Sequence, residues 1–402
     1  MSTVVLDITL DLPENVDTLD EIRNFIQQYN IPTYQFTPIS GVGTEPFTVF
    51  RQPVINESGV LAFEGFVAPD APPGSILTGD GQRIDRIADF ERGLDITFGA
   101  SFNDHGVVSF TGNTFGGSID APLAASGVFV GNGSFFMTVA SRDTFVEEFG
   151  NFEFFGPSSI NDRLDSIDVA FIGINSRFDV GVFLYEGGHI STIASSLGEF
   201  DSFNKQIPTI GGDGPFTIYA PPALDDHGTV YFTASLDNGK RGIFAGDGQQ
   251  IKTIVDSKLE FDRFSAPSIN NQGSVAFLAQ LDNHSSGIYV RDFNGNTETI
   301  ATSDGPFSEF LSDPSLNNKG DVAFQATLDN GKEGIFVGSD PVLDKVIAVG
   351  DQLGSSTVSR LLFGGREAFN GAGQLAFGAV LADGTEGIFR AQPFLTGYKV
   401  LA

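Results

Sequence analysis

The chain has 402 residues and a formal net charge of −29, from 51 acidic and 22 basic side chains. Such a surface repels phosphate backbones and anionic lipid, so nucleic acid and membrane surfaces are not expected as partners. The sequence has no Cys, which excludes disulfides, thiolate metal sites and thiol catalysis. With 40 Phe it can build a large core, and its 49 Gly and 19 Pro favour many short strands over long helices.

Residues 1–44 are predicted to form an N-terminal extension. Within it, residues 3–12 alternate like an edge strand, and residues 17–29 have the pattern of a short helix with an acidic first turn. The start lacks the basic and long apolar regions of a classical signal peptide, and no apolar run reaches the roughly 18 residues of a transmembrane helix. The extension is expected either to add an edge strand and plug or to supply the closing strand of the last repeat.

Residues 45–402 consist of seven copies of one repeat. Its core, Asn-x-x-Gly-x-x-Ala-Phe, is clearest at residues 270–277 (NNQGSVAF) and 317–324 (NNKGDVAF). A second half follows, in which Gly-Ile-Phe or a close variant leads through a Gly/Asp turn to a run that ends near Ile-Ala. A period of this size is typical of a propeller blade. The copies begin at Asn56, Asn103, Asn161, Asp225, Asn270, Asn317 and Asn370.

Each part of the repeat has a structural reason. Pro-Ser-Ile or Pro-Ser-Leu before the Asn predicts a short innermost strand, because Pro can begin a strand without losing a ladder hydrogen bond. The Asn or Asp opens a tight turn, and the Gly closes it at positive φ. The Val-Ala-Phe run forms the second strand, with its Phe packed between sheets, and the second half supplies strands three and four. The predicted fold is all-β, a seven-bladed β-propeller of four-stranded antiparallel blades.

This string of motifs resembles the NxxGxVAF tandem repeat common in cyanobacterial exported proteins. It is more distantly similar to the TolB-type propeller repeat, with its Pro-Asp-Gly turn and following Ile-Ala-Phe. The resemblance covers about residues 45–402 and implies a propeller, but it brings no catalytic residues with it. It also implies export, and members often bear a C-terminal sorting anchor, whereas this sequence ends in Tyr-Lys-Val-Leu-Ala.

The two faces of the ring are predicted to differ. The Asn-x-x-Gly and Gly-Asp-Gly turns are short and uniform, whereas the connections on the other face vary in length. Variable loops are where binding residues concentrate, so any site is predicted on the variable-loop face. The connections between blades contain Phe-x-x-Phe at 200–203, 261–264 and 307–310, which we interpret as packing between blades rather than an aromatic cage.

The residues just before each innermost strand are expected to ring the mouth of the central tunnel. Where blades 6, 7 and 1 meet, these residues are charged, and a tyrosine faces them across the channel. One interpretation is a salt-bridge set that joins the ends of the ring. The other is an anion-binding or acid–base site, with a carboxylate flanked by guanidinium groups. The candidate tunnel-mouth residues are Arg51, Tyr219, Asp313, Arg366 and Glu367.

The sequence predicts no metal site and no cofactor. His105 and His227 share one exposed turn position, and no two histidines have ligand spacing on one strand. An EF-hand loop, a P-loop and a Gly-x-Ser-x-Gly elbow are all missing. Acidic turns such as Gly246-Asp247-Gly248 could still hold Ca²⁺ weakly.

Together these features predict a non-catalytic propeller that binds a protein or small-molecule ligand through its variable-loop face and tunnel mouth. The alternative is a tunnel-mouth enzyme that resembles the cyanobacterial aryl-alkylating (Friedel–Crafts) propeller enzymes, whose calcium-binding repeat domain is missing here. In that alternative, Asp313 or Glu367 would be the base. Arg51 and Arg366 would bind an anionic leaving group, and Tyr219 would orient it.

Overall fold

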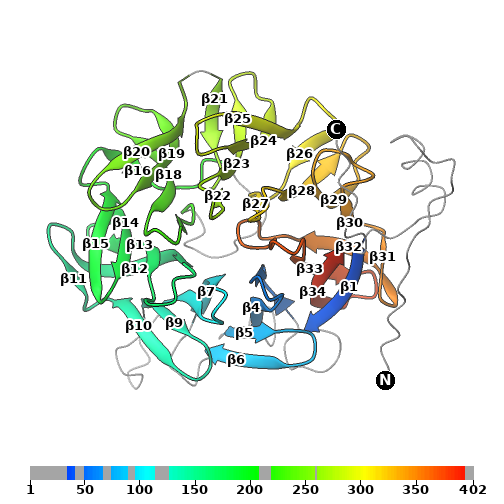
Figure 1. The fold of residues 1–402 in the computed structure, drawn as a ribbon, viewed down its shortest axis with the longest axis horizontal. Coiled ribbons are helices and arrows are strands. Elements are labelled where there is room, and N and C mark those ends of the chain that lie inside the picture. The colour runs from blue at the N-terminus through cyan, green and yellow to red at the C-terminus, as the bar shows by residue number, and fades with distance from the viewer. Residues whose placement is uncertain are drawn as a thin grey trace.

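Seven β-sheets stand around a central axis as the blades of a propeller (Figure 1). The computed structural model describes residues 34–40, 49–66, 74–88, 96–113, 126–207, 219–258 and 260–393. The predicted all-β, seven-bladed architecture is confirmed, and these residues contain no helix. The same residues therefore offer no helical segment that could span a bilayer. The strand at 3–12 and the helix at 17–29 fall outside the described residues.

The blades are numbered 1 to 7 in chain order. Blade 1 contains β2 (Val49–Phe50), β3 (Val54–Ile55), β4 (Leu61–Phe66), β5 (Ser75–Gly79) and β6 (Ile84–Ala88). Blade 2 contains β7 (Ile96–Phe102), β8 (Val108–Asn113), β9 (Gly127–Gly131) and β10 (Phe136–Ser141). Blade 3 contains β11 (Phe145–Val146), β12 (Gly150–Ile160), β13 (Val169–Asn175), β14 (Val180–Glu186) and β15 (His189–Ser195).

The remaining blades are given in the same way, with their strands in chain order. Blade 4 contains β16 (Phe200–Ser202), β17 (Ala223–Leu224), β18 (Val230–Leu236), β19 (Arg241–Gly246) and β20 (Ile251–Asp256). Blade 5 contains β21 (Phe261–Phe264), β22 (Ser268–Ile269), β23 (Val275–Leu281), β24 (Ser286–Arg291) and β25 (Thr297–Thr302). Blade 6 contains β26 (Phe307–Phe310), β27 (Ser315–Leu316), β28 (Val322–Leu328), β29 (Glu333–Val337) and β30 (Lys345–Ala348). Blade 7 contains β31 (Gln352–Leu353), β32 (Ser356–Leu362), β33 (Leu375–Leu381), β34 (Glu386–Pro393) and β1 (Tyr34–Ser40).

The innermost strand of blades 4, 5 and 6 is broken into two pieces. The predicted Pro-Ser-Ile and Pro-Ser-Leu strands are present as β22 and β27, and the Phe-x-x-Phe run forms a second piece that pairs with the same neighbour. The rings of Phe203, Phe264 and Phe307 are at most 1% exposed. The interpretation of these pairs as packing between blades is therefore confirmed.

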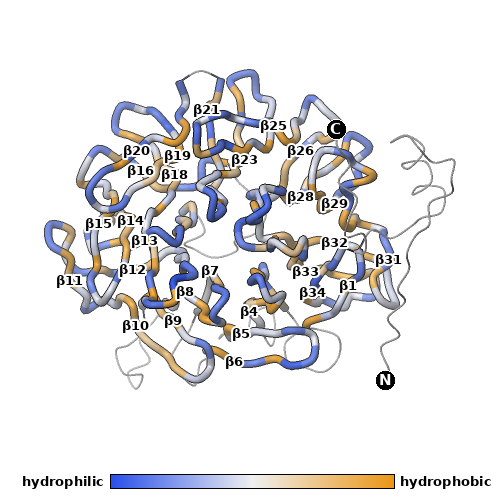
Figure 2. Tube along the Cα trace, viewed as in Figure 1, coloured by the Kyte–Doolittle hydropathy of each residue, from blue (hydrophilic) through white to orange (hydrophobic). Residues whose placement is uncertain are grey.

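The Phe of each Val-Ala-Phe run packs against the preceding blade. Phe277 of β23 lies in one cluster with Tyr231 and Ile243 of blade 4, and Phe324 of β28 lies with Ile288 of blade 5. Burial of each such ring contributes about 2–3 kcal/mol, so these contacts hold neighbouring blades together. Figure 2 shows the complementary pattern, with hydrophobic strands and largely hydrophilic turns around the centre.

The ring closes through a strand from the N-terminal side. β1 lies within the 1–44 segment and pairs antiparallel with β34, from Tyr34 opposite Pro393 to Ser40 opposite Ile388. Figure 1 shows this blue strand beside the red one. Blade 7 thus takes its outermost described strand from the start of the chain, which joins the two ends of the ring in one sheet.

Candidate functional site

The Asn that begins each repeat connects its turn to the next blade. Asn103 Oδ1 accepts hydrogen bonds from the turn amides of His105 and Val107, at 3.1 and 2.9 Å. Its Nδ2 donates to the backbone oxygen of Asn161 in blade 3 at 3.1 Å. Six of the seven turns make the second kind of bond. Polar bonds therefore join most neighbouring blades around the mouth of the channel.

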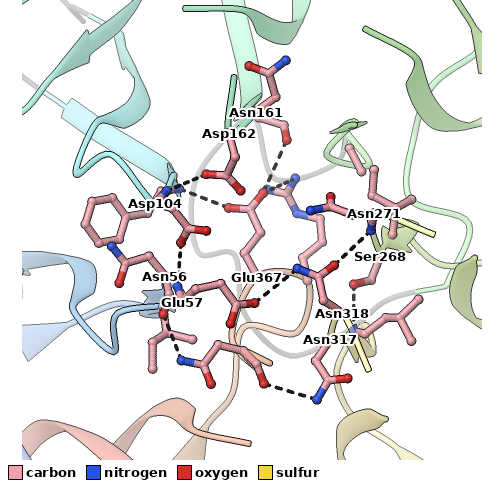
Figure 3. Close-up of a pocket in the computed structure, with 18 of the residues that line it drawn as sticks. Asn56, Glu57, Asp104, Asn161, Asp162, Ser268, Asn271, Asn317, Asn318 and Glu367 are labelled. Atoms are coloured by element: carbon pink, nitrogen blue, oxygen red, sulfur yellow. Dashed lines mark hydrogen bonds and ion pairs between the residues drawn. The ribbon is translucent and has the colours of Figure 1, made fainter. Parts of the chain in front are cut away.

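The residue after each Asn forms the rim of this mouth. In the first four blades it is acidic, in the next two an amide, and in the last a glycine. At five of the seven junctions a side-chain oxygen accepts the backbone N–H of the rim residue of the preceding blade, as from Glu57 N to Asp104 Oδ1 at 2.7 Å. These bonds hold the carboxylates in place around the axis (Figure 3). In blade order the rim residues are Glu57, Asp104, Asp162, Asp226, Asn271, Asn318 and Gly371.

Inside the rim lies a cavity of about 120 Å³. Inner-strand side chains such as Ile160, Leu224 and Leu316 form its wall. Arg366 and Glu367 of blade 7 also line it, and Figure 3 shows Glu367 in the middle of the ring of rim residues. The cavity is thus apolar at its sides and charged at its mouth and centre.

Glu367 reaches across the channel to blades 2 and 3. Its carboxylate accepts hydrogen bonds from Ser101 Oγ at 2.9 Å, Phe102 N at 3.2 Å and Ser159 Oγ at 3.4 Å. Arg366 Nη1 donates to the backbone oxygen of Pro222 in blade 4 at 2.6 Å and lies 3.6 Å from Glu367 Oε1. Two consecutive residues of blade 7 therefore connect it to three blades on the far side of the ring.

A tight backbone turn points these two side chains at the axis. Arg366 has a φ of 27° and Gly365 a φ of 65°. A Cβ at Gly365 would lie 2.1 Å from the backbone oxygen of Asp313, so only glycine fits this close approach. Asp313 itself is buried in blade 6.

Two of the five predicted tunnel-mouth residues, Arg366 and Glu367, come together in this cavity. Arg51 instead lies 3.7 Å from Glu64 and has its guanidinium 4.8 Å from the centre of the Phe66 ring. Asp313 and Tyr219 are not among the residues that line the cavity. Tyr219 forms an isolated bridge with Asn204 in blade 4.

The cavity opens on the face of the Asn-x-x-Gly turns, not on the variable-loop face to which the sequence assigned any site. The innermost strands next to these turns are only two residues long in several blades, so residues at their starts lie close to the turns. Arg366 and Glu367 therefore reach the turn side. The connections at 67–73, 89–95, 114–125 and 208–218, which the sequence assigned to the variable-loop face, fall outside the described residues.

Sequence reasoning did not single out the rim carboxylates. The signal was present, because the position after the leading Asn or Asp is acidic in four consecutive repeats. The buried Glu64 was also missed, since it occupies a position where the other blades have unlike residues. Its Oε1 accepts the Gly99 N–H of blade 2 at 2.7 Å. Burial raises the pKa of Glu64 to about 7, against the opposing effects of Arg51 and the Gly99 N–H.

The carboxylates at the rim and centre of the mouth influence one another's ionisation. Burial raises the pKa of Asp162 to about 6, and the charges of Asp104, Asp226 and Glu367 add to this rise. The Asp104 N–H bond opposes it. No three His, Cys, Asp or Glu side chains in the described parts of the chain are grouped so that they could hold one metal ion. Weak Ca²⁺ binding stays a prediction.

Comparison with known proteins places the chain in a family and gives its fold relatives. The model of a family of unknown function (DUF7453) matches residues 37–393. None of the curated proteins matches the chain in sequence. Its likeness to the cyanobacterial NxxGxVAF repeat stays a prediction.

Two solved structures illustrate the fold likeness. Oligogalacturonate lyase in complex with manganese is 11% identical, with a TM-score of 0.52 over 90% of this chain and 98% of that one. A puromycin-hydrolyzing peptidase of Mycobacterium tuberculosis is also 11% identical, with a TM-score of 0.52 over 92% of this chain and 56% of that one. At this identity the likeness concerns the fold alone.

Proposed function

Because the chain belongs to DUF7453, a family of unknown function, we propose from the site itself that it is a non-catalytic binding propeller whose channel mouth receives a cationic group of its ligand. The observation that supports this proposal is the row of rim carboxylates in four consecutive blades. Backbone N–H groups hold these carboxylates in place, so little reorganisation is needed on binding.

The chemistry of the mouth favours an ammonium or guanidinium group. Hydrogen bonds between such a group and a carboxylate contribute about 1.5–3 kcal/mol each. Among the described residues that line the cavity, the one cation is Arg366, which already donates to Pro222 and lies beside Glu367. With about 120 Å³ available, the cavity admits a single head group rather than a whole ligand. The ligand is then a protein with a protruding Lys or Arg, or a small organic amine.

Titration calorimetry with defined probes tests this proposal. Short oligolysine and oligoarginine peptides represent the protein ligand, and spermidine represents the small amine. The triple variant Asp104→Asn, Asp162→Asn, Asp226→Asn removes three rim charges. It keeps an acceptor for each backbone N–H, just as Asn318 Oδ1 already accepts from Asn271 N at 3.0 Å. We expect the triple variant to bind the better probe on the order of ten- to a hundredfold more weakly.

A matched control separates a site from general attraction to an acidic protein. Asp237, Asp282 and Asp329 are exposed residues in the second-to-third strand turns of blades 4, 5 and 6, on the opposite face. Their triple Asn variant removes the same charge and should leave affinity within about twofold, because distant surface charges are screened. Equal losses in the two triple variants would show that the mouth is not a specific site.

A further inference from the structure

In the described residues, the turn at 225–228 of blade 4 lacks the polar bonds to the next blade that most other turns make. Asp225 stands at the Asn position and has no N–H to donate to blade 5. Within the described residues, neither Asp226 N nor the His227 ring is hydrogen-bonded to blade 5. The junction between blades 5 and 6 has three such bonds. Asn270 Nδ2 donates to Asn317 O at 3.4 Å. Asn271 N donates to Asn318 Oδ1 and Gln272 Nε2 to Asn318 O, both at 3.0 Å.

A groove of about 660 Å³ opens at this same junction. It lies between β20 of blade 4 and the turn at residues 291–295 of blade 5. Blade 5 differs from three other blades in the residue that ends its third strand, which is Arg291 instead of glycine.

Those glycines allow close contact with the preceding blade. A Cβ at Gly246 would lie only 2.8 Å from Ile193 of blade 3, and one at Gly79 would lie 2.8 Å from Ile39 of β1. A Cβ at Gly131 would lie 3.4 Å from Ile87. An arginine cannot fit such a contact, so the blade 5 turn stands away from β20 and leaves the groove.

The groove combines an aromatic platform with two cations. Phe293 is 75% exposed, yet its ring packs over Gly273, where a Cβ would lie 3.4 Å from Phe293 Cδ2. Lys252 and Arg291 also line the groove, and neither is paired with a carboxylate in the described residues. Within the described part of the chain, Arg291 Nη1 donates to Thr297 Oγ1 alone, at 2.9 Å.

The two carboxylates in the groove are already satisfied within their own turns. Asp247 Oδ1 accepts from Gln249 N and Gln250 N, both at 2.9 Å. Asp292 accepts from Asn296 N and Asn296 Nδ2, at 2.7 and 2.8 Å. These hydrogen bonds lower the pKa of both carboxyls, so both stay ionised. Lys252 and Arg291 therefore offer donors to the groove, while its two carboxylates are already engaged by their own turns.

We propose that this groove binds an acidic saccharide, with one sugar ring over Phe293 and its carboxylate between Lys252 and Arg291. The negative face of an aromatic ring attracts the positively polarised C–H groups of a sugar. Ammonium and guanidinium groups pair with a carboxylate. Sugar hydroxyl oxygens can accept hydrogen bonds from the N–H groups of these cations that the carboxylate does not engage. The volume lies within the roughly 300–1,000 Å³ of small-ligand sites.

The test measures binding of glucuronic acid oligosaccharides and of neutral glucose oligomers of equal length. We expect the acidic oligomers to bind at least about tenfold more tightly than the neutral ones, because only they engage both cations. Phe293→Ala and Lys252→Ala should each weaken binding about tenfold or more. The matched control is Phe178→Ala, since Phe178 is 74% exposed in the β13–β14 turn of the other face. It should bind like wild type.

A second variant changes Arg291, the residue that holds the blade 5 turn away from β20. Arg291→Gly restores the residue found in blades 1, 2 and 4, and it should abolish saccharide binding without lowering the melting temperature. The rim triple variant should bind the saccharide normally, so failure of one site is distinguishable from failure of the other. No binding at millimolar saccharide, equal binding of neutral oligomers, or an equal loss in Phe178→Ala would overturn the proposal.

Discussion

Two turns of almost identical sequence behave differently in this ring. Residues 103–106 of blade 2 are Asn-Asp-His-Gly, and residues 225–228 of blade 4 are Asp-Asp-His-Gly. The first turn bonds to blade 3 through Asn103 Nδ2, through its second backbone N–H and through His105 Nε2, which lies 2.9 Å from Asp162 O. The second turn makes none of these bonds to blade 5 in the described residues.

Each turn nevertheless closes on itself in the same way. Asp225 Oδ1 accepts from His227 N at 2.9 Å and Thr229 N at 2.8 Å, as Asn103 Oδ1 does in blade 2. Only the side-chain N–H is lost when Asp replaces Asn. Turn closure therefore needs the side-chain oxygen alone, whereas the bond between blades needs the amide nitrogen.

The apolar contact between blades 4 and 5 stays intact. Tyr231 of β18 and Phe277 of β23 share one buried cluster, with exposed fractions of 9% and 0%. Burial, and then the charge of Asp225, raise the pKa of Tyr231 to about 12. The open junction is therefore confined to the turn face, above a packed core.

The largest effect should come from breaking the bond between the blade 2 turn and blade 3. Asn103→Asp removes the donor to Asn161 O and places a third carboxylate beside Asp104 and Asp162. A buried carbonyl left without its partner costs about 1–3 kcal/mol, so we expect the free energy of unfolding to fall by about 2–3 kcal/mol. Chemical denaturation measures it. Asn238→Asp, in an exposed turn, is the control and should change stability by less than about 0.5 kcal/mol; equal effects would mean that the bond between blades contributes nothing.

The reverse change should close the open turn. Asp225→Asn restores an Nδ2 that can donate to Asn270 O, and it removes a charge close to the buried Tyr231. One added hydrogen bond contributes about 0.5–1.5 kcal/mol, so stability should rise by about 1 kcal/mol. Thermal and chemical denaturation both report this change. A variant no more stable than wild type would show that another feature keeps the junction open.

The turn chemistry was predictable from the sequence, and its role between blades was not. Asn followed by Gly three residues later predicts a tight turn wherever it occurs, and the positive φ of Gly106 and Gly228 agrees with it. Whether the Asn Nδ2 finds an acceptor depends on the next blade, some 47 to 64 residues away. A local sequence pattern carries no information about a contact with a residue that far away in the chain.

The candidate site was predictable in part for a similar reason. Arg366 and Glu367 stand out as charges where most other blades have small or apolar residues, and both lie in the cavity. Arg51 was grouped with them by its place in the repeat. Its partner Glu64 lies on the neighbouring strand, and the pairing of β2 with β4 brings the two together. Side-chain direction, which repeat alignment does not give, decides this difference.

A smaller effect should come from the ionisation of Asp162, which accepts the Asp104 N–H at the junction between blades 2 and 3. Its pKa in the folded protein, about 6, lies above the 3.8 of an unperturbed carboxyl. The native state thus binds this proton more tightly, so the contribution of Asp162 to stability is greatest below pH 4 and falls as pH rises through 6. The free energy of unfolding of Asp162→Asn, relative to that of wild type, should therefore rise by about 1 kcal/mol between pH 4 and pH 7. This amount is reduced for solvent screening, because the site is only half-buried. Unfolding curves at both pH values measure it, and a constant difference would contradict it.

The smallest effect concerns two single amides. Asp104 N donates to Asp162 Oδ1, whereas Asp226 N has no acceptor in blade 5 among the described residues. Hydrogen exchange follows local opening, so the Asp226 amide should exchange about tenfold faster or more than that of Asp104.

The neighbouring amides give the control, because His105 N and His227 N are both bonded within their own turns and should exchange at similar rates. In Asp225→Asn the Asp226 amide should slow toward the rate of Asp104. Equal rates for Asp104 and Asp226 in the wild-type protein would mean that the two junctions are equally closed in solution. The groove between blades 4 and 5 would then depend on Arg291 alone.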